Sequence, residues 1–360
     1  MNWQDFRVNS RLNLNPLVVE QVYAMIAEID GVKNSWQITK RLSPQAVTRL
    51  TRSVIVTSAG SSNRIEGNRL SDIEVENLYK NLRIKKFKTR DEQEVAGYLQ
   101  CFELILNHYN DISISESSIL KLHHDMLVYS EKDTRHRGQY KFGSNRVEAK
   151  DHNGNVVGVI FDPTPPHLVK KEMQELLGWY NWAVAAKAKH PLILLANFIF
   201  EYLAIHPFQD GNGRISRLLT NLILLQQGYL FTSIVSHDQI IEANKVDYYL
   251  ALNKTQNTWK TTAEDISPWL LFFISSIKTQ SCKTLKVLES DNIEHLLSEK
   301  QLALLQWAIA RGMEFGRRDA IEALGFPART VESIIKKLVD LKRLRRLGQG
   351  KATHYQLWQP

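Results

Sequence analysis

The spacing of apolar residues along the chain predicts a protein built mainly from α-helices. Over most of the sequence, apolar side chains recur at steps of three and four residues, which gathers them on one face of a helix. The helices that this spacing predicts cover residues 16–29, 44–66, 71–82, 91–106, 117–127, 190–205 and 215–227. Pro44 suits a first helical turn, and Gly67 with Asn68 suits a helix end. There is no internal repeat, so we expect a mostly α fold with local exceptions.

One internal segment departs from the helical spacing. An Asn- and Gly-rich run at 151–155 is followed by an apolar, β-branched run at 156–161 and by a proline-rich run at 163–166. We therefore expect a β-hairpin within about residues 140–166. The exposed edge of such a hairpin can accept the backbone of another chain, although a purely structural ribbon stays open as the alternative.

The last part of the chain has a pattern of its own. Three helices are expected at 302–310, 317–324 and 327–341, followed by strand-like runs at 343–347 and 353–358 around a Gly348-Gln349-Gly350 turn. Three helices and a hairpin resemble a winged helix. We therefore expect an N-terminal helical region at 1–110, a central core at 111–280 and a winged-helix domain at 290–360.

A phosphate site is indicated between the two most apolar helices, where residues 206–217 read HPFQDGNGRISR. Gly211 and Gly213 permit a turn whose N–H groups converge on an oxyanion, and the following helix adds its own N-terminal donors. Arg214 and Arg217 lie three residues apart in the first turns of that helix. Cations are disfavoured at this end of a helix unless an anion lies between them, so the pair indicates a polyphosphate.

The same run carries candidate catalytic groups. Asp210 is a hard oxygen ligand that suits Mg²⁺ bridging phosphate oxygens. His206 can take a proton from an attacking hydroxyl, and Phe208 is expected to anchor the loop in the core. A structural loop is the alternative, but such a loop does not need an acid, two turn glycines and two arginines together.

This run resembles the Fic-domain signature, HPFx[D/E]GNGRxxR, at every specified position. The resemblance implies a protein AMP-transferase in which the histidine deprotonates a Tyr, Ser or Thr hydroxyl, which attacks the ATP α-phosphate and releases pyrophosphate. His206 would be the base, Asp210 the Mg²⁺ ligand and Arg217 the γ-phosphate ligand. The implied ATP-binding residues are Gly211, Asn212, Gly213, Arg214, Ile215, Ser216 and Arg217. Gly213 favours AMP transfer over phosphorylation, because the Doc-like kinase branch has lysine there.

A second resemblance lies at residues 62–67, SNRIEG, which match the family's inhibitory motif [S/T]xxxE[G/N]. The resemblance implies that Glu66, with Ser62 one helical turn before it, pairs with Arg217 and prevents a productive ATP pose. The alternative is a local pair with Arg64 or Arg69, or plain solvation. If the implied role holds, the chain restrains itself without a separate inhibitor subunit.

The resemblance also assigns contacts to the base and to the target. A tyrosine pair, Tyr248-Tyr249, and the amide of Gln256 would lie against adenine, and the hairpin would be a flap that aligns the target. The flap residues expected beside ATP are Val159, Ile160 and Phe161. The family often has asparagine where Gln256 stands, and aromatic residues at helical spacing equally suit a core.

Composition fits an intracellular enzyme. The chain has 360 residues, of which 43% are hydrophobic, so it can bury a large core in two or three domains. Cys101 and Cys282 lie far apart in apolar surroundings, which indicates core thiols and neither a disulfide nor a metal site. The start lacks a basic-then-apolar signal, and the most apolar stretch, 192–205, is short and carries Asn197 and Glu201. We expect a cytoplasmic protein with no membrane partner.

Positive charge is concentrated at the C-terminal end. From residue 300 onward there are twelve Lys or Arg against five Asp or Glu, in a chain with a net charge of +8. If this part binds DNA, residues of the helix at 327–341 would enter the major groove and hairpin residues would meet phosphate. The candidate DNA contacts are Arg329, Thr330, Ser333, Lys336, Lys337, Arg345, Arg346 and Lys351. Protein docking and homodimer formation stay open, because winged helices serve those roles as well.

Two functions from different classes follow from these residues. The first is an autoinhibited AMP-transferase that uses ATP and Mg²⁺ on a protein hydroxyl, including a hydroxyl of the chain itself. The second is a DNA-binding transcriptional regulator whose nucleotide site senses ATP. His206 favours the first, because a sensor needs no base. A third possibility reverses the direction, with Glu66 orienting water so that AMP is removed from a modified protein.

Overall fold

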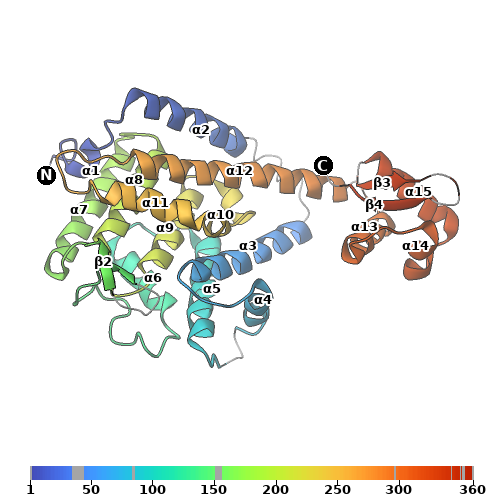
Figure 1. The fold of residues 1–360 in the computed structure, drawn as a ribbon, viewed down its shortest axis with the longest axis horizontal. Helices are drawn as coiled ribbons and strands as arrows, with labels where there is room; N and C mark the ends of the chain where they lie inside the picture. Colours follow the sequence, from blue (N-terminus) through green and yellow to red (C-terminus); the bar gives the residue numbers. More distant parts are fainter. Residues whose placement is uncertain are drawn as a thin grey trace. The chain divides into compact units, whose positions relative to one another are not determined.

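The chain divides into two units, each described here by itself (Figure 1). One comprises Met1–Gln37 with Val47–Leu285, and the other comprises Ile38–Ala46 with Lys286–Pro360. The computed structural model describes residues 2–34, 44–82, 86–150, 156–295, 297–341, 343–348, 350 and 353–358. Within these residues, no helix has the length and apolar character that crossing a membrane requires.

The first unit is almost entirely helical, as the apolar spacing predicts. Its helices are α1 (Arg7–Ser10), α2 (Pro16–Asn34), α3 (Pro44–Ile65), α4 (Asp72–Lys80), α5 (Arg90–His108), α6 (Glu116–Met126), α7 (Pro166–Ala185), α8 (Pro191–Ile205), α9 (Asn212–Gln226), α10 (His237–Ala243), α11 (Lys245–Gln256) and α12 (Ser267–His295), with a 3₁₀ turn at Leu230–Ser233. Sequence analysis assigns no helix to α1, α7, α10 or α12. Residues 44–46 of α3 and 286–295 of α12 are counted with the second unit. Several of the predicted helices begin or end a few residues from their observed bounds.

Local capping explains where the predicted helices begin. Ser71 and Thr89 each accept the N–H of the third helical residue, and the glutamate at that position reaches back to the cap. These capping boxes start α4 and α5. Helix α9 starts at Asn212, three residues before its predicted start, because Gly211 caps it in the left-handed conformation with φ of 82°.

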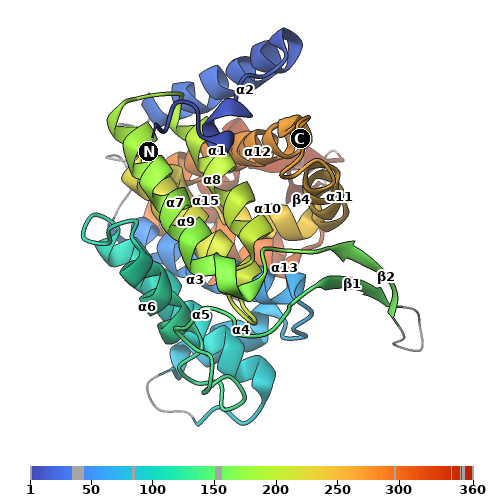
Figure 2. The same cartoon turned by 90° about the vertical axis from the view of Figure 1, so that its left-hand side faces the viewer.

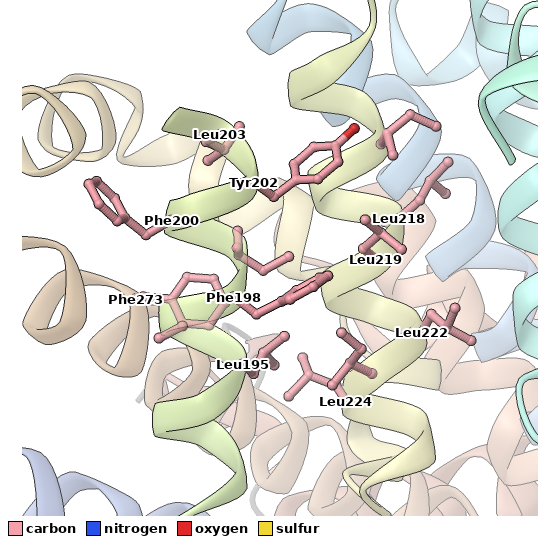
Figure 3. Close-up of a cluster of buried hydrophobic side chains, with 14 of the residues drawn as sticks. Leu195, Phe198, Phe200, Tyr202, Leu203, Leu218, Leu219, Leu222, Leu224 and Phe273 are labelled. Atoms are coloured by element: carbon pink, nitrogen blue, oxygen red, sulfur yellow. The ribbon is translucent and has the colours of Figure 1, made fainter. Parts of the chain in front are cut away.

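Helices α8 and α9 form the centre of the core (Figure 3). Every residue of α8 from Leu192 to Ile205 is buried, so this mostly apolar helix is enclosed on all sides. Phe198 and Tyr202 of α8 face Leu218 and Leu222 of α9. Each large side chain buried in this way contributes roughly 1.5–3 kcal/mol. The loop that joins the two helices is therefore anchored at both ends in the buried core of the unit.

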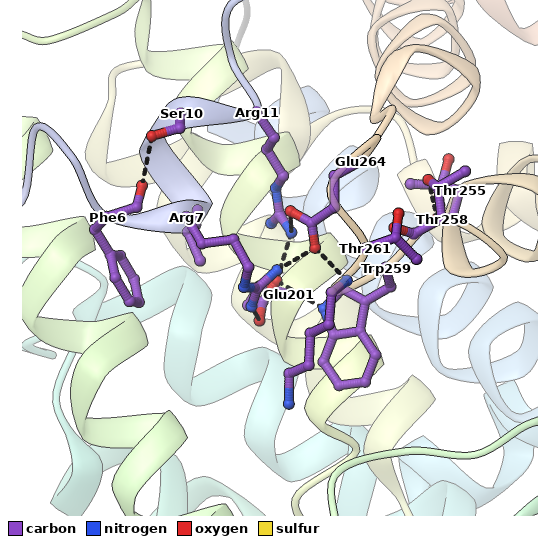
Figure 4. Close-up of polar contacts among 12 residues, drawn as sticks. Phe6, Arg7, Ser10, Arg11, Glu201, Thr255, Thr258, Trp259, Thr261 and Glu264 are labelled. Carbon is purple, nitrogen blue, oxygen red and sulfur yellow. Dashed lines mark hydrogen bonds and ion pairs between the residues drawn. The ribbon is translucent and has the colours of Figure 1, made fainter.

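A buried polar cluster ties the N-terminus to this core (Figure 4). Glu201 of α8 accepts hydrogen bonds from Arg7, from Arg11 at 2.5 Å and from the Trp259 indole at 3.1 Å. Glu264 pairs with Arg7 as well. A buried carboxylate is tolerated only when it is paired and hydrogen-bonded, and here two guanidinium groups satisfy it. The segment around α1 is thus held against the middle of α8.

The β-hairpin projects from the helical part of the unit, while β2 keeps contact with α11 (Figure 2). Strands β1 (Val147–Lys150) and β2 (Val156–Phe161) pair antiparallel, with Val147 opposite Phe161 and irregular register near both ends. Arg146 and Asp162, which flank the two strands, form an ion pair at 3.0 Å. The Asn- and Gly-rich turn expected at 151–155 lies outside the described residues.

The second unit has its own core. Helices α13 (Glu299–Arg311), α14 (Arg317–Leu324) and α15 (Ala328–Asp340) are followed by the antiparallel strands β3 (Leu344–Leu347) and β4 (His354–Leu357). The core includes Leu304, Phe315, Val331, Ile335 and Leu338, all nearly inaccessible. Helix α15 buries one apolar stripe and leaves most of its polar side chains exposed.

Candidate active site

The loop between α8 and α9 begins at a residue with unusual backbone geometry. His206 caps α8 with φ of 52°, a left-handed conformation that few residues other than glycine adopt, and its N–H bonds to Tyr202 O at 3.0 Å. Strain of this kind concentrates at functional sites, where the surroundings enforce it. The imidazole is half-buried, and its Nδ1 lies 3.3 Å from Leu203 O. Nδ1 can therefore donate to that carbonyl, which leaves Nε2 as the free base.

Burial keeps this imidazole neutral. Removal of the ring from water lowers the pKa of His206 to about 4, and the nearby Lys141 cation acts in the same direction. The carboxylates of Glu66 and Asp210 oppose the shift without cancelling it. A neutral imidazole is the form that can accept a proton at neutral pH.

The rest of the loop is fixed from inside. Phe208 is fully buried, as expected, and its ring stacks on His123 of α6 at a centroid distance of 3.7 Å. Asn212 bonds back to both the N–H and the carbonyl of Phe208 at 2.8 Å. His123 accepts from Gly138 N at 2.9 Å, so its other nitrogen can donate to Asp210 O at 3.0 Å. Sequence analysis did not identify His123 as a support of the loop.

Two further supports come from the segment before the hairpin. The Asn145 amide donates to His206 O at 3.2 Å and to Phe208 O at 2.7 Å. Lys141 donates from Nζ to Asn145 Oδ1 at 2.6 Å and to Ile205 O at 3.3 Å. These contacts couple the foot of the hairpin to the strained histidine. No motif in the sequence marks Lys141 or Asn145, because their role depends on backbone carbonyls that are distant along the chain.

The first turn of α9 forms an anion cradle. The N–H groups of Asn212, Gly213 and Arg214 belong to the first turn and have no intrahelical acceptor, and the positive end of the helix dipole lies with them. Ile215 had been expected to bind ATP, but its N–H bonds to Gly211 O at 2.9 Å and its side chain is fully buried. Ile215 therefore has no free polar group for a ligand. The Ser216 hydroxyl is likewise engaged, since it donates to Gly213 O at 2.7 Å.

Arg214 and Asp210 lie beside this cradle. Arg214 is buried, and its guanidinium is 3.2 Å from Asp210 Oδ1 and 3.3 Å from Glu94 Oε2. Asp210 is 41% exposed and also pairs with Arg90 at 3.2 Å. Burial would raise the pKa of Asp210, but the charge of Arg214 and other contacts leave that pKa below its usual value. Asp210 is thus ionised and reachable from solvent, as a metal ligand must be.

The residues present fit Mg²⁺ only together with a phosphate. Among the described residues, no group of three or more His, Cys, Asp or Glu side chains could enclose a metal ion. A single exposed carboxylate next to an anion cradle is the arrangement in which Mg²⁺ is held jointly by protein and nucleotide. Asp210 is the residue of the loop that offers such an oxygen.

Arg217 forms the ion pair that the inhibitory motif implies. Its Nη2 donates to Glu66 Oε1 at 2.7 Å and to Ser62 O at 2.9 Å, and its Nε donates to Ser62 Oγ at 2.7 Å. Although burial alone would lower the pKa of Arg217, the charge of Glu66 contributes most to raising it above its ordinary value. Of the local alternatives for Glu66, Arg64 pairs instead with Glu242 and Asp72, and no ion pair joins Glu66 to Arg69 among the described residues, although the Glu66 side chain remains one-third exposed.

The carboxylate of Glu66 also covers the cradle. A Cβ placed on Gly213 would lie only 2.2 Å from Glu66 Oε1 and 3.2 Å from Arg217 Nη1. Glu66 therefore occupies the space directly over the first turn of α9. Within the described residues, Arg217 Nη1 and Arg214 Nε are buried without a hydrogen-bond acceptor. An anion in place of the carboxylate would satisfy such donors.

The expected adenine contacts are only partly available. Tyr248 is 5% exposed and packs against Trp269 and Phe272, and burial raises its pKa to about 12. Tyr249 is 42% exposed and could meet a ligand. Gln256 is half-buried at the end of α11. The tyrosine pair thus divides into one core residue and one surface residue.

The three expected flap residues also differ in their surroundings. Val159 and Ile160 belong to β2, where Val159 is opposite Glu148 of β1 and Ile160 lies at a shift in the register. Phe161 is buried, and its ring packs against Trp259 at a centroid distance of 5.4 Å. Phe161 therefore anchors the hairpin, and its aromatic face is not open to a nucleotide.

In the second unit, the candidate DNA contacts lie mostly on the surface. The exposed members are Arg329, Ser333, Lys336, Lys337, Arg345 and Arg346, while Thr330 is half-buried. Five of the candidates come from α15, and the two arginines come from β3. The remaining candidate, Lys351, lies outside the described residues.

Both cysteines are free thiols, Cys101 buried and Cys282 half-buried.

Comparison with known families and proteins gives one consistent match. Residues 113–224 match the model of the Fic/DOC family. A Fido domain-containing protein of Dictyostelium discoideum is 30% identical over 111 residues, which are 31% of this chain and 73% of that protein. The protein adenylyltransferase fic-1 of Caenorhabditis briggsae is 26% identical over 227 residues, 61% of this chain. The chain covers only 41% of that relative's length.

Solved structures share the fold. A Fic family protein from Desulfovibrio desulfuricans aligns over 96% of this chain and 97% of its own, with a TM-score of 0.61 and 22% identity. A Fic domain-containing signalling protein from Bacteroides thetaiotaomicron aligns over 73% of this chain and 98% of its own, with a TM-score of 0.59 and 24% identity. At these identities the likeness speaks for the fold alone.

Proposed function

The chain belongs to the Fic/DOC family, and on that premise we propose that it transfers AMP from ATP to a Tyr, Ser or Thr hydroxyl of a protein. Relatives named protein adenylyltransferase, in Caenorhabditis briggsae and Nematostella vectensis among others, support this reaction class. The observation that carries the proposal is local. His206 ends α8 and Asp210 precedes the first turn of α9, so a histidine and a carboxylate, both with lowered pKa values, lie on the loop that leads into one anion cradle.

The chemistry requires one proton transfer and one displacement. Nε2 of His206 takes the proton of the target hydroxyl, and the hydroxyl oxygen forms a bond to the α-phosphorus of ATP. The bond from that phosphorus to the bridging oxygen breaks, and pyrophosphate leaves with the electron pair. The left-handed backbone of His206, fixed through Asn145, orients the imidazole for this step.

Binding of the triphosphate is assigned to the cradle. The N–H groups of Asn212, Gly213 and Arg214 would hold the α- and β-phosphates, with the Arg214 guanidinium beside them. Arg217 would hold the γ-phosphate through the donors that now face Glu66. Asp210 would bind Mg²⁺ together with phosphate oxygens, and the ion would neutralise phosphate charge there.

Glu66 would act as a built-in restraint. Its carboxylate occupies the guanidinium that the γ-phosphate needs and lies over Gly213, where that phosphate would approach. Two anions cannot share this space, so a productive triphosphate must displace Glu66. The opposite assignment, removal of AMP with Glu66 orienting a water, remains the second candidate, because the carboxylate lies next to the cradle.

The second unit is proposed to be a winged helix that binds DNA. Three helices followed by a two-stranded hairpin support that interpretation, as do the exposed basic side chains of α15 and β3. Helix α15 would be the recognition helix, because its apolar stripe faces the core and its polar face is free. In the alternative, this unit docks a protein or a second copy of the chain.

Intact-mass spectrometry tests the reaction class directly. The Glu66→Gly protein, incubated with ATP and Mg²⁺, is expected to gain the mass of AMP on itself or on an added protein. A Glu66→Gly, His206→Ala protein provides the background. Removal of AMP from a modified protein by the wild type, but not by Glu66→Gly, would instead favour the reverse reaction.

Salt dependence tests the second unit. The full chain should bind duplex DNA with an affinity that falls steeply as salt rises, because each phosphate contact releases counterions. Replacement of Lys336 and Lys337 by Gln should reduce both the affinity and the salt slope. Equal binding by this double variant would leave docking as the better account.

A further inference from the structure

An open pocket of about 490 Å³ lies at the foot of the hairpin. Its walls come from segments 141–146 and 162–166, which flank the two strands, and from Trp259 and Lys260. The floor is connected to the candidate active site, since Lys141 and Asn145 both bond to carbonyls of residues 205–208. The pocket shares no residue with the anion cradle on α9.

The pocket contains a buried cation without a counter-ion. Lys141 is 4% exposed and yet lines the pocket. Its ammonium donates to the Asn145 amide oxygen and to Ile205 O, and within the described part of the chain no carboxylate forms an ion pair with it. Burial lowers the pKa of Lys141 to about 8, so the group stays largely charged at neutral pH. A buried ammonium has three donors, and one is left over here.

The other two cations of the pocket are neutralised. Arg146 pairs with Asp162 at 3.0 Å, and Lys260 pairs with Glu172 at 2.6 Å while lying over the Trp259 ring. Asp162 and Glu172 also act on Lys141, but only from beyond ion-pair distance, so among the described cations of the pocket Lys141 is the one without a carboxylate in contact. A ligand that supplies one negative charge would give Lys141 the ion-pair partner that the other two cations already have.

We propose that this pocket receives an acidic side chain of the target protein, close in sequence to the hydroxyl that is modified, and that Lys141 forms the ion pair with it. The position follows from the proposed function, on which this inference rests, because a hydroxyl that reaches His206 carries its neighbouring residues past the foot of the hairpin. A carboxylate suits the pocket better than an apolar side chain, since an apolar group would bury the free ammonium donor without a partner.

Peptide binding to the full chain tests the pocket without relying on transfer. The probes are fluorescein-labelled peptides with a central Phe, which cannot be modified, and with a single Glu or the matched Gln at each other position. At one position the Glu peptide should bind about tenfold or more tightly than the Gln peptide, because a buried charge-assisted hydrogen bond contributes roughly 1.5–3 kcal/mol.

Matched lysine variants identify the residue responsible. Lys141→Met should abolish the preference for Glu, and Lys141→Arg should restore it. Lys189→Met, which removes an exposed lysine at the far end of α8, should leave the preference unchanged. ATP binding by Lys141→Met reports whether the loop has kept its structure.

The outcomes separate this inference from the proposed function. Equal binding of Glu and Gln peptides at every position, a preference that survives Lys141→Met, or no binding at all would overturn the pocket assignment. The same peptides with Tyr in place of Phe report transfer by Glu66→Gly. Transfer without a preference for Glu would refute the pocket assignment and leave the proposed AMP transfer intact. A preference for Glu without transfer would refute the proposed AMP transfer and leave the pocket assignment intact.

Discussion

Replacement of Glu66 by glycine is the perturbation that most directly tests the proposed restraint. Glu66 follows the last residue of α3, where its N–H bonds to Asn63 O and the next residue, Gly67, is already left-handed. The substitution therefore changes no helical turn and buries no new group. Its main effect is to remove the carboxylate from Arg217 and from the space above Gly213.

The size of the effect follows from that contact. A hydrogen bond to a charged group contributes roughly 1.5–3 kcal/mol, which corresponds to about a 10- to 150-fold change in an equilibrium. Arg217 is almost fully buried while Glu66 is one-third exposed, so solvent screening favours the lower part of that range. We expect Glu66→Gly to raise AMP incorporation by at least about tenfold, because a triphosphate no longer has to displace the carboxylate.

The assay is incorporation of labelled AMP under single-turnover conditions, together with ATP affinity by calorimetry. Glu66→Gln keeps the size of the side chain without its charge and should lie between the wild type and the glycine variant. Glu66→Asp keeps the charge on a shorter stem and should remain restrained only if the ion pair can still reach Arg217. Incorporation that stays flat or falls in Glu66→Gly, in a protein that still binds ATP, would refute the restraint.

Four further outcomes are expected. His206→Ala in the Glu66→Gly background should lose transfer by about 100-fold or more while ATP affinity by calorimetry stays within a few fold, because the base acts on the hydroxyl and not on phosphate; transfer that persists would remove the base assignment. In Glu66→Gly, kcat/KM against pH should stay level from pH 8 to about 5.5, since the active form is the neutral imidazole and burial lowers the pKa of His206 to about 4; a decline centred near the ordinary histidine pKa of about 6.5 would contradict this. Arg90→Ala should lower the Mg²⁺ concentration for half-maximal transfer by about 1.4- to fivefold, because it frees Asp210 from an exposed ion pair of roughly 0.2–1 kcal/mol, whereas Lys88→Ala should not. Glu201→Gln should lower the free energy of unfolding in urea by about 3 kcal/mol, the lower end of the cost of breaking a buried pair, because Arg11 would keep only Glu264 at 3.9 Å; an unchanged midpoint would show that the cluster in Figure 4 does not carry that stability.

The proposed restraint also bears on how the wild-type chain would be studied. Because Glu66 and the γ-phosphate compete for Arg217, the wild type should show weak incorporation even at saturating ATP. Weak activity of the wild type is therefore no argument against the reaction class. The Glu66→Gly, His206→Ala pair of variants separates a restrained enzyme from an inactive one.

The sequence by itself determined the helical character of the chain and the composition of the signature loop. Apolar spacing requires only local periodicity, so α5, α8 and α15 could be predicted to within a few residues. The loop chemistry was equally local, because His206, Asp210 and the first turn of α9 lie within twelve residues. The pairing of Glu66 with Arg217 came from a motif resemblance and not from any local rule.

Only the tertiary structure decided which of these groups are free to act. Whether Ile215 or Tyr248 can meet a ligand depends on burial against distant helices, which periodicity does not encode. Lys141 acquires its role from the carbonyl of Ile205, more than sixty positions later, and His123 acquires its role from a ring stacked on it across the core. The residue type determines which reactions a side chain can take part in, but packing between distant parts of the chain determines its exposure to water and its partners.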